Sequence, residues 1–129
     1  MPGGVEVAEK TVLNIVHFLG KCLERNGVNA SRIIVFGSSA TGAVRKDGDI
    51  DLVIVSEDFR GKSILERIKM TGQPEVQTIR KFMVPLDIIT MTPEELESET
   101  SPVAGYARQG RVMFPAGAAT GKLKHAAAR

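Results

Sequence analysis

Two aspartates, Asp49 and Asp51, stand two residues apart at the start of an apolar segment that runs to Val55. Residues at this spacing on a strand point to the same face of a sheet, so a strand here brings both carboxylates to one place. Carboxylates that close repel each other unless a positive group lies between them, and a divalent cation with oxygen ligands meets that need. The alternative is a pair of surface acids on a half-exposed strand. Because residues 50–55 are otherwise apolar on both faces, acids are costly here, which favours a metal-binding or catalytic role.

A glycine-serine turn at residues 37–39 follows the apolar run at residues 33–36. Where a buried strand leads into a helix, backbone N–H groups and small hydroxyls converge, and the helix N-terminus favours a phosphate group. On its own, the turn is better explained as an ordinary tight turn, since small residues serve that purpose as well. The turn becomes informative through its position, because ten residues separate Gly37-Ser38 from Asp49.

Together the two features resemble the signature of the DNA polymerase-β-like nucleotidyltransferase superfamily, and in particular its minimal nucleotidyltransferase family. That family has a Gly-Ser-x-Ala-Arg-Gly turn followed by Ser-Asp-Ile-Asp-Leu. Here residues 37–42 read Gly-Ser-Ser-Ala-Thr-Gly, and residues 48–52 read Gly-Asp-Ile-Asp-Leu. The family's third acid, on a neighbouring strand, is matched by Asp87 within Pro-Leu-Asp-Ile-Ile. With the continuation Thr-Pro-Glu-Glu-Leu at residues 92–96, the resemblance covers about residues 10–114.

The resemblance implies a magnesium-dependent enzyme that transfers a nucleoside monophosphate, AMP from ATP being the expected case, to an acceptor hydroxyl. In the family, the acids that match Asp49 and Asp51 bind two magnesium ions bridging the phosphates of the nucleotide. The acid that matches Asp87 holds the metal nearer the acceptor and helps to activate its hydroxyl. Two metals stabilise both the attacking and the leaving oxygens of an in-line displacement, and positioning supplies much of the remaining rate. The residues expected to hold the triphosphate are Gly37, Ser38 and Ser39.

Two departures from the family pattern concern the phosphate site. Thr41 stands where the family has arginine, and Gly48 where it commonly has serine. Arg45 or Lys46 would restore the missing positive charge, although both lie in a polar loop where solvated side chains are the simpler interpretation. The changes leave the three acids intact and weaken the prediction of nucleotide binding.

Many members of the family act as antitoxins beside a small helical ribonuclease of the HEPN type, which they modify or bind. The resemblance therefore implies a partner toxin, or a second copy of this chain, as the source of the acceptor site. The alternative function is a non-catalytic module that masks such a ribonuclease. The departure at Thr41 favours masking, whereas the three retained acids favour the enzyme.

Two segments resemble known ligand-binding loops, a P-loop and an EF-hand, but neither has the residues that its loop requires. Residues 61–63, Gly-Lys-Ser, lack the glycine that a P-loop requires five positions earlier, where Ser56 stands. The acids at positions 47, 49 and 51 imitate a calcium-binding EF-hand, but the glycine and glutamate positions of that loop hold Leu52 and Asp58. Of the remaining reactive residues, Tyr106 is expected to serve in packing.

Hydrophobic periodicity predicts helices over residues 5–25 and 61–71, a further short helix opening at Pro74, and a helix start at residues 92–95. Strands are expected at residues 33–36, 50–55 and within 84–91, while residues 111–114 form either a final strand or an apolar docking segment. This alternation predicts an α/β (α+β) domain over residues 1–115, with a small mixed β-sheet flanked by helices. The resemblance implies the polymerase-β-like nucleotidyltransferase fold. Residues 116–129 are expected to be a disordered basic tail.

Composition narrows the function classes. The single cysteine, Cys22, excludes an internal disulfide and falls on the apolar stripe of the first helix, which predicts an inert core thiol. The absence of a membrane-spanning segment from the sequence makes the cytoplasm the expected location. The net charge of +2 depends on residues 116–129, which hold three basic residues and no acid. Without them 14 basic residues face 15 acidic ones, so direct nucleic-acid binding is not expected.

Overall fold

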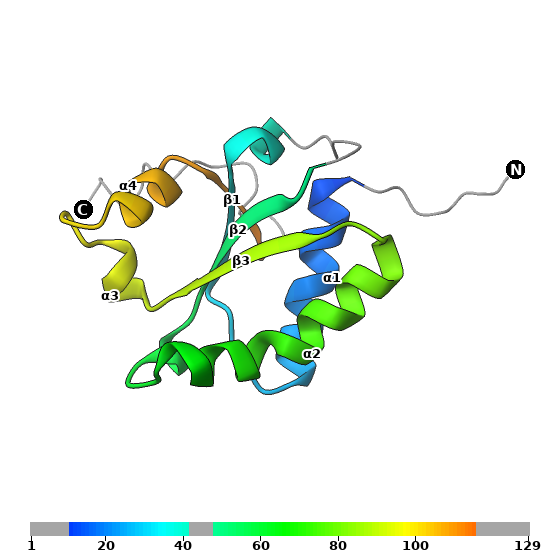
Figure 1. Cartoon of the computed structure of the whole chain (residues 1–129), viewed down its shortest axis with the longest axis horizontal. Coiled ribbons are helices and arrows are strands. Elements are labelled where there is room, and N and C mark those ends of the chain that lie inside the picture. Colours follow the sequence, from blue (N-terminus) through cyan, green and yellow to red (C-terminus); the bar gives the residue numbers. More distant parts are fainter. Residues whose placement is uncertain (1–10, 42–47, 116–129) are drawn as a thin grey trace, which may run out of the picture.

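A four-stranded sheet in the order β3-β2-β1-β4 forms the centre of the molecule (Figure 1). The computed structural model describes residues 11–41 and 48–115, apart from the side chains of Ser38 and Thr41. β1 pairs antiparallel with β2 and with β4, whereas β2 and β3 are parallel. The small mixed sheet predicted from the sequence is confirmed. The strands are β1 (Arg32–Phe36), β2 (Ile50–Val55), β3 (Leu86–Met91) and β4 (Arg111–Phe114).

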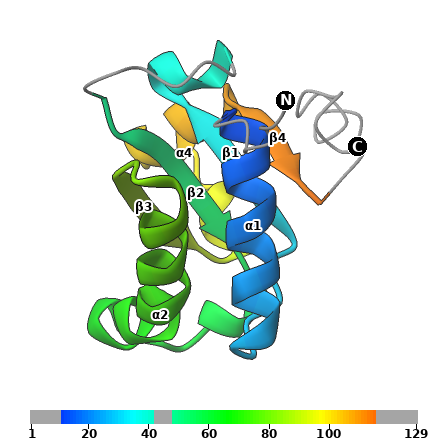
Figure 2. The same cartoon turned by 90° about the vertical axis from the view of Figure 1, so that its right-hand side faces the viewer.

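Helices cover both faces of the sheet (Figure 1, Figure 2). One face is covered by α1 (Val12–Arg25) and α2 (Ile64–Phe82), and the other by α3 (Pro93–Leu96) and α4 (Pro102–Arg108). Side chains that alternate along β1 fill both layers: Ile33 and Val35 join the core beneath α1, while Ile34 and Phe36 join the core beneath α4. The central strands read as continuous apolar runs because both of their faces are buried.

The first helix begins at Val12, because Thr11 is extended and its hydroxyl accepts a hydrogen bond from the Asn14 backbone N–H at 3.1 Å. It ends at Arg25, and Gly27, which follows the C-cap residue Asn26, takes a positive φ of 84°. The predicted helix over residues 5–25 is thus correct in its end, but the observed helix does not include Thr11, which is extended. Residues 5–10 of the prediction lie outside the described part of the chain.

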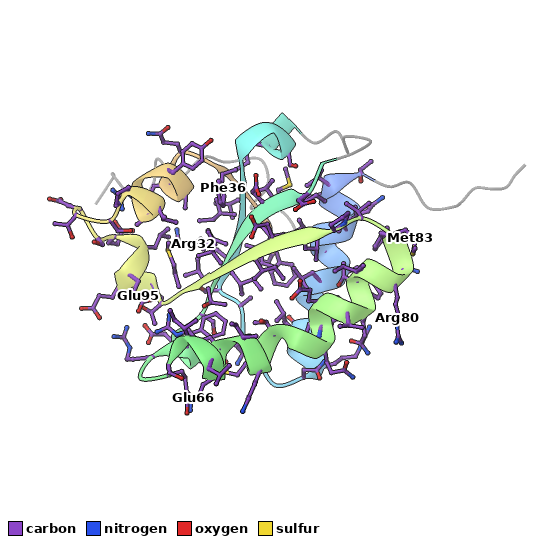
Figure 3. All side chains as sticks on the ribbon, viewed as in Figure 1. Arg32, Phe36, Glu66, Arg80, Met83 and Glu95 are labelled. Atoms are coloured by element: carbon purple, nitrogen blue, oxygen red, sulfur yellow. The ribbon has the colours of Figure 1, made fainter. Side chains whose placement is uncertain are left out.

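The prediction of one helix over residues 61–71 and a second opening at Pro74 is wrong, because α2 runs unbroken through Pro74. A capping box opens it: the Ser63 hydroxyl accepts from the Glu66 N–H at 3.1 Å, and the Glu66 carboxylate accepts from the Ser63 N–H at 2.7 Å. Pro74 removes one backbone hydrogen bond but is buried. Packing of α2 against α1 therefore outweighs the local preference of proline. The helix ends at Phe82, and Met83, the residue directly beyond it (labelled in Figure 3), closes it. Met83 has a left-handed φ of 58°.

Residues 101–114 contain a helix that the sequence reading missed and a strand that it left open. Ser101 caps α4 by accepting the Ala104 N–H at 3.1 Å, and Pro102 occupies its first turn. The segment 111–114 is a strand, because Val112 pairs with Ile34 of β1. The capped start predicted at residues 92–95 is confirmed.

No helix in the described part of the chain is both long enough and apolar enough to cross a membrane.

A pair of glycine substitutions tests the packing of α1 on the sheet. A Cβ at Gly20 would lie 2.2 Å from the Phe114 ring, whereas a Cβ at Gly72 would meet nothing within 4 Å. We expect Gly20→Ala to lower the free energy of unfolding by about 1–3 kcal/mol through overpacking. The matched control Gly72→Ala, inside α2, should raise it by up to about 1 kcal/mol. Urea denaturation measures both, and equal stability of Gly20→Ala and the wild type would contradict this packing.

Candidate active site

Asp51 of β2 and Asp87 of β3 are direct partners across the parallel strand pair. Their side chains therefore leave the same face of the sheet, and their carboxyl groups are within hydrogen-bonding reach of each other. This is the face that carries α3 and α4, because Val53 and Val55 further along β2 belong to the core there. At the start of the pair, the Ile50 N–H donates to the Pro85 carbonyl at 3.0 Å.

The electrostatics of this pair are unfavourable for two charged carboxylates. Burial raises the pKa of Asp51, and the neighbouring Asp87 and then Asp49 raise it further. Glu75, on α2, lies within electrostatic range of Asp87: burial raises the pKa of the Glu75 carboxyl, and Asp87 adds to the effect. The fold thus brings Asp51 and Asp87 into contact, with Asp49 and Glu75 close enough to influence them electrostatically. No sequence signal marks Glu75, because only the packing of α2 beside β3 places it there.

Gly37 allows the turn to lie against Asp51. Its φ is +70°, a conformation that residues with a side chain rarely adopt. A Cβ there would also lie 2.9 Å from Asp51 Oδ2. Both observations require glycine at this position. Without a side chain, the backbone of the predicted phosphate-binding turn lies directly beside Asp51.

Ser39 connects the turn to the start of the acid motif. Its side chain is only 2% exposed, and its hydroxyl donates to the Asp49 carbonyl at 3.4 Å. In this arrangement the hydroxyl holds the two ends of the intervening loop together, while the Asp49 side chain is exposed. A phosphate contact by Ser39 stays a prediction. The predicted roles of the Ser38 hydroxyl and of Arg45 and Lys46 fall outside the described part of the structure.

Arg111 of β4 brings a positive charge to the turn, which sequence reasoning did not anticipate. Its guanidinium donates to the Ala40 carbonyl at 3.2 Å, within the short 3₁₀ helix η1 (Gly37–Thr41). The arginine that the family has in this turn is Thr41 here. Antiparallel pairing of β4 with β1 therefore supplies a cation at the same turn from a remote segment.

The donor set suits a hard divalent cation. Carboxylate oxygens are the ligands that magnesium prefers, and a cation between Asp51 and Asp87 would relieve their repulsion. Across residues 11–41 and 48–115, no three His, Cys, Asp or Glu side chains are grouped closely enough to hold an ion as they stand. The described arrangement is thus a close pair with Asp49 exposed, and a role of Asp49 as a further ligand stays a prediction.

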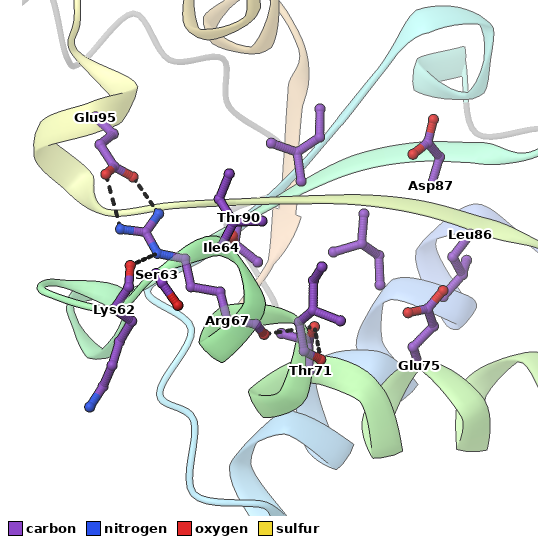
Figure 4. Close-up of a pocket in the computed structure, with 13 residues that line it drawn as sticks. Lys62, Ser63, Ile64, Arg67, Thr71, Glu75, Leu86, Asp87, Thr90 and Glu95 are labelled. Carbon is purple, nitrogen blue, oxygen red and sulfur yellow. Dashed lines mark hydrogen bonds and ion pairs between the residues drawn. The ribbon is translucent and has the colours of Figure 1, made fainter.

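A groove of about 840 Å³ runs between α2 and β3, from Asp87 and Glu75 at one end to Lys62 at the other (Figure 4). β3 is the outer strand of the described sheet, so this groove follows its free edge. Ile64 and Ile68, which line it from α2, are 77% and 57% exposed. Near the Lys62 end, the Arg67 guanidinium pairs with both carboxylate oxygens of Glu95, at 2.7 and 3.0 Å.

Comparisons with known proteins agree with this geometry. The sequence matches the family model described as a nucleotidyltransferase domain over residues 15–107. It is 29% identical over 89 residues to a Methanocaldococcus jannaschii protein named "Putative protein adenylyltransferase". That match covers 68% of this chain and 60% of the relative, so the chain spans less than two thirds of the relative's length.

Two solved structures share the fold. A "putative nucleotidyltransferase from Sulfolobus solfataricus" has a TM-score of 0.50 at 22% identity, with 64% of this chain and 68% of that chain covered. A "toxin-antitoxin with AMP-PNP" has a TM-score of 0.54 at 18% identity, with 80% and 73% covered. The fold expected from the sequence is therefore confirmed.

Asp51→Asn tests whether the acid pair costs the protein stability. Like charges about 4 Å apart repel by about 1 kcal/mol even at the dielectric of water. We therefore expect the variant, without added metal, to melt about 4 °C or more above the wild type at neutral pH. Because the pKa of Asp51 is raised, wild-type stability falls as pH rises from the ordinary value of 3.8 through the raised pKa, and the gain should shrink toward acidic pH.

The matched control is Glu99→Gln, which also replaces an acid by its amide but lies exposed between α3 and α4. Its melting temperature should stay within about 2 °C of the wild type, since surface changes rarely exceed about 0.5 kcal/mol. A destabilised Asp51→Asn at neutral pH would show that the two carboxyl groups support each other instead of repelling.

Proposed function

We infer, from the premise that this chain belongs to the nucleotidyltransferase domain family, that it transfers AMP from ATP to an acceptor hydroxyl and releases pyrophosphate. The observation that supports this most strongly is the contact between Asp51 and Asp87 beside the Gly37 turn. Two like charges held together at a real cost in free energy are expected where a cationic ligand binds. The name of the M. jannaschii relative is in line with AMP as the transferred group.

The site residues have separate proposed roles in phosphate binding, acceptor activation and metal binding. The backbone at Gly37 and the guanidinium of Arg111 would hold the β- and γ-phosphates. Asp87, which lines the groove, would orient the acceptor hydroxyl and accept its proton as the general base. The acceptor oxygen then bonds to the α-phosphorus while the bond from that phosphorus to the pyrophosphate oxygen breaks. Magnesium, held by Asp49, Asp51 and Asp87, would neutralise charge on the phosphates during this displacement.

The acceptor is proposed to be a partner protein that docks in the groove between α2 and β3. Apolar side chains as exposed as Ile64 and Ile68 are typical of a protein interface when they gather beside a free strand edge. The groove ends at Asp87, so a docked chain would present a hydroxyl to the candidate catalytic acid. The structural likeness to a toxin–antitoxin supports a toxin as this partner. A HEPN-type ribonuclease is the specific candidate, because the family resemblance of the sequence implies one.

The exposed apolar side chains of the groove, Ile64 and Ile68, also favour a second function: masking the toxin without transferring a nucleotide. Thr41, in place of an arginine in the turn, weakens the phosphate site and points the same way. The two functions differ in whether the acids are needed, which separates them experimentally.

Replacing either acid of the pair tests catalysis. With labelled ATP, magnesium and a candidate HEPN-type partner protein, Asp51→Asn and Asp87→Asn should lower the rate of label transfer by about a hundredfold or more. Even outer partners of a metal site are worth about 10- to 100-fold. Glu99→Gln should transfer label at the wild-type rate. Neutralisation of the partner in cells by an Asp51→Asn, Asp87→Asn double variant would favour masking over transfer.

A charge placed in the groove tests docking. Ile68→Lys should weaken binding of the partner by about tenfold or more, because a buried unpaired charge is strongly unfavourable at an interface. ATP binding should not change, since Ile68 lies on α2 away from the Gly37 turn. The control Val103→Lys changes an apolar residue of α4 that is 43% exposed and lies outside the groove. Equal partner affinity of Ile68→Lys and the wild type, by calorimetry, would remove the groove as the docking site.

A further inference from the structure

A second, smaller cleft of about 270 Å³ lies between η1 and α4. It is separate from the groove along α2, and its volume is below the roughly 300–1,000 Å³ of pockets that enclose a whole small ligand. It therefore suits one ring system better than an entire nucleotide. The residues that line it are Phe36, Gly37, Ala40, Tyr106, Gln109 and Gly110.

Tyr106 forms one wall of this cleft and is held by Phe36. The two rings meet edge to face, with centroids 5.2 Å apart and planes at 73°. Phe36 points toward α4 (Figure 3) and is buried. Tyr106, in contrast, is 55% exposed. Phe36 thus fixes the tyrosine ring while leaving much of its surface open to solvent. An oriented aromatic ring with an open surface is what a flat ligand needs for stacking.

The backbone around Tyr106 is fixed against the sheet. The Arg108 guanidinium donates to the carbonyls of Leu96 and Ser98, which ties α4 to the segment before it. A Cβ at Gly110 would lie 2.5 Å from the Val35 carbonyl, so the chain after α4 runs in close contact with β1. The cleft is consequently preformed, which lowers the entropic cost of ordering it around a ligand.

The cleft adjoins the candidate active site directly. Phe36 pairs with Asp51 across β1 and β2, and Asp51 pairs with Asp87 across β2 and β3. Residues opposite each other on neighbouring strands share a face and lie about 5 Å apart. The acid pair and the aromatic pair therefore stand in one row on the same face. Gly37 belongs to both, since it lines the cleft and contacts Asp51.

We propose that this cleft binds the base of the nucleotide, with the base stacked on Tyr106 and its polar edge facing the Gln109 side chain. The proposal rests on the proposed function, because phosphates held at Gly37 would bring the base into reach of the cleft. Stacking on an aromatic side chain tolerates any base, while the Gln109 amide offers a donor and an acceptor for discrimination between bases.

The composition of the chain makes the test specific: Tyr106 is its only tyrosine, and it has no tryptophan. Intrinsic fluorescence of the full chain therefore reports on this ring alone. With magnesium present, ATP should quench the tyrosine fluorescence, and inorganic tripolyphosphate, which lacks a base, should bind without quenching it. Binding of ATP with no change in fluorescence would overturn the proposal.

Calorimetry on variants completes the test. Tyr106→Ala should weaken ATP binding by about fivefold to a hundredfold, the range expected for one stacked base, and leave tripolyphosphate affinity unchanged. Tyr106→Phe keeps the ring and should retain wild-type affinity, as should Val103→Ala on the same helix. Equal ATP affinity of Tyr106→Ala and the wild type would overturn the base site alone. A wild-type chain that binds tripolyphosphate but not ATP would do the same, whereas one that binds neither would overturn the proposed function with it.

Discussion

The parallel register of β2 with β3 places Asp51 beside Asp87, and the surrounding structure has to hold two like charges together. Apolar layers on both faces of the sheet do this. A slip of one residue would turn Asp51 toward the core beneath α1 and expose Leu52 in its place, so the register is strongly determined. The contact with Asp51 also requires glycine at position 37, because the backbone there has a positive φ and a Cβ would lie too close to the Asp51 carboxylate.

The features proposed to bind ligands lie around this contact on different sides. Asp87 belongs both to the acid pair and to the groove along α2, which connects the acids with an apolar docking surface. On the opposite side of Asp51 from Asp87, Phe36 of β1 is its strand neighbour, and the Phe36 ring contacts Tyr106. An acceptor on one side and a nucleotide base on the other would then meet at the acids. The short 3₁₀ helix η1, with Arg111 bound to its Ala40 carbonyl, closes the phosphate side.

Predictions from local sequence failed where packing between distant segments determines the structure. Proline predicts a break at residue 74, yet α2 passes through it because its contacts with α1 stabilise the whole helix. The short helix α4 has no long apolar period, and only the Ser101-Pro102 start marks it in the sequence. Tyr106 is an exposed wall of a cleft more than a packing residue, since its neighbour Phe36 lies seventy positions earlier in the chain.

The sequence by itself determined the buried strands, the spacing that puts Asp49 and Asp51 together, and the glycine turn before them. These depend on apolar runs, on the two-residue period of a strand and on the conformational freedom of glycine, which are local properties. Tertiary structure alone decided that Asp87 touches Asp51, that Glu75 lies within electrostatic range of Asp87 and that Arg111 reaches the turn. Each of these contacts joins segments far apart in the chain, so it exists only once strand order, register and helix packing are set.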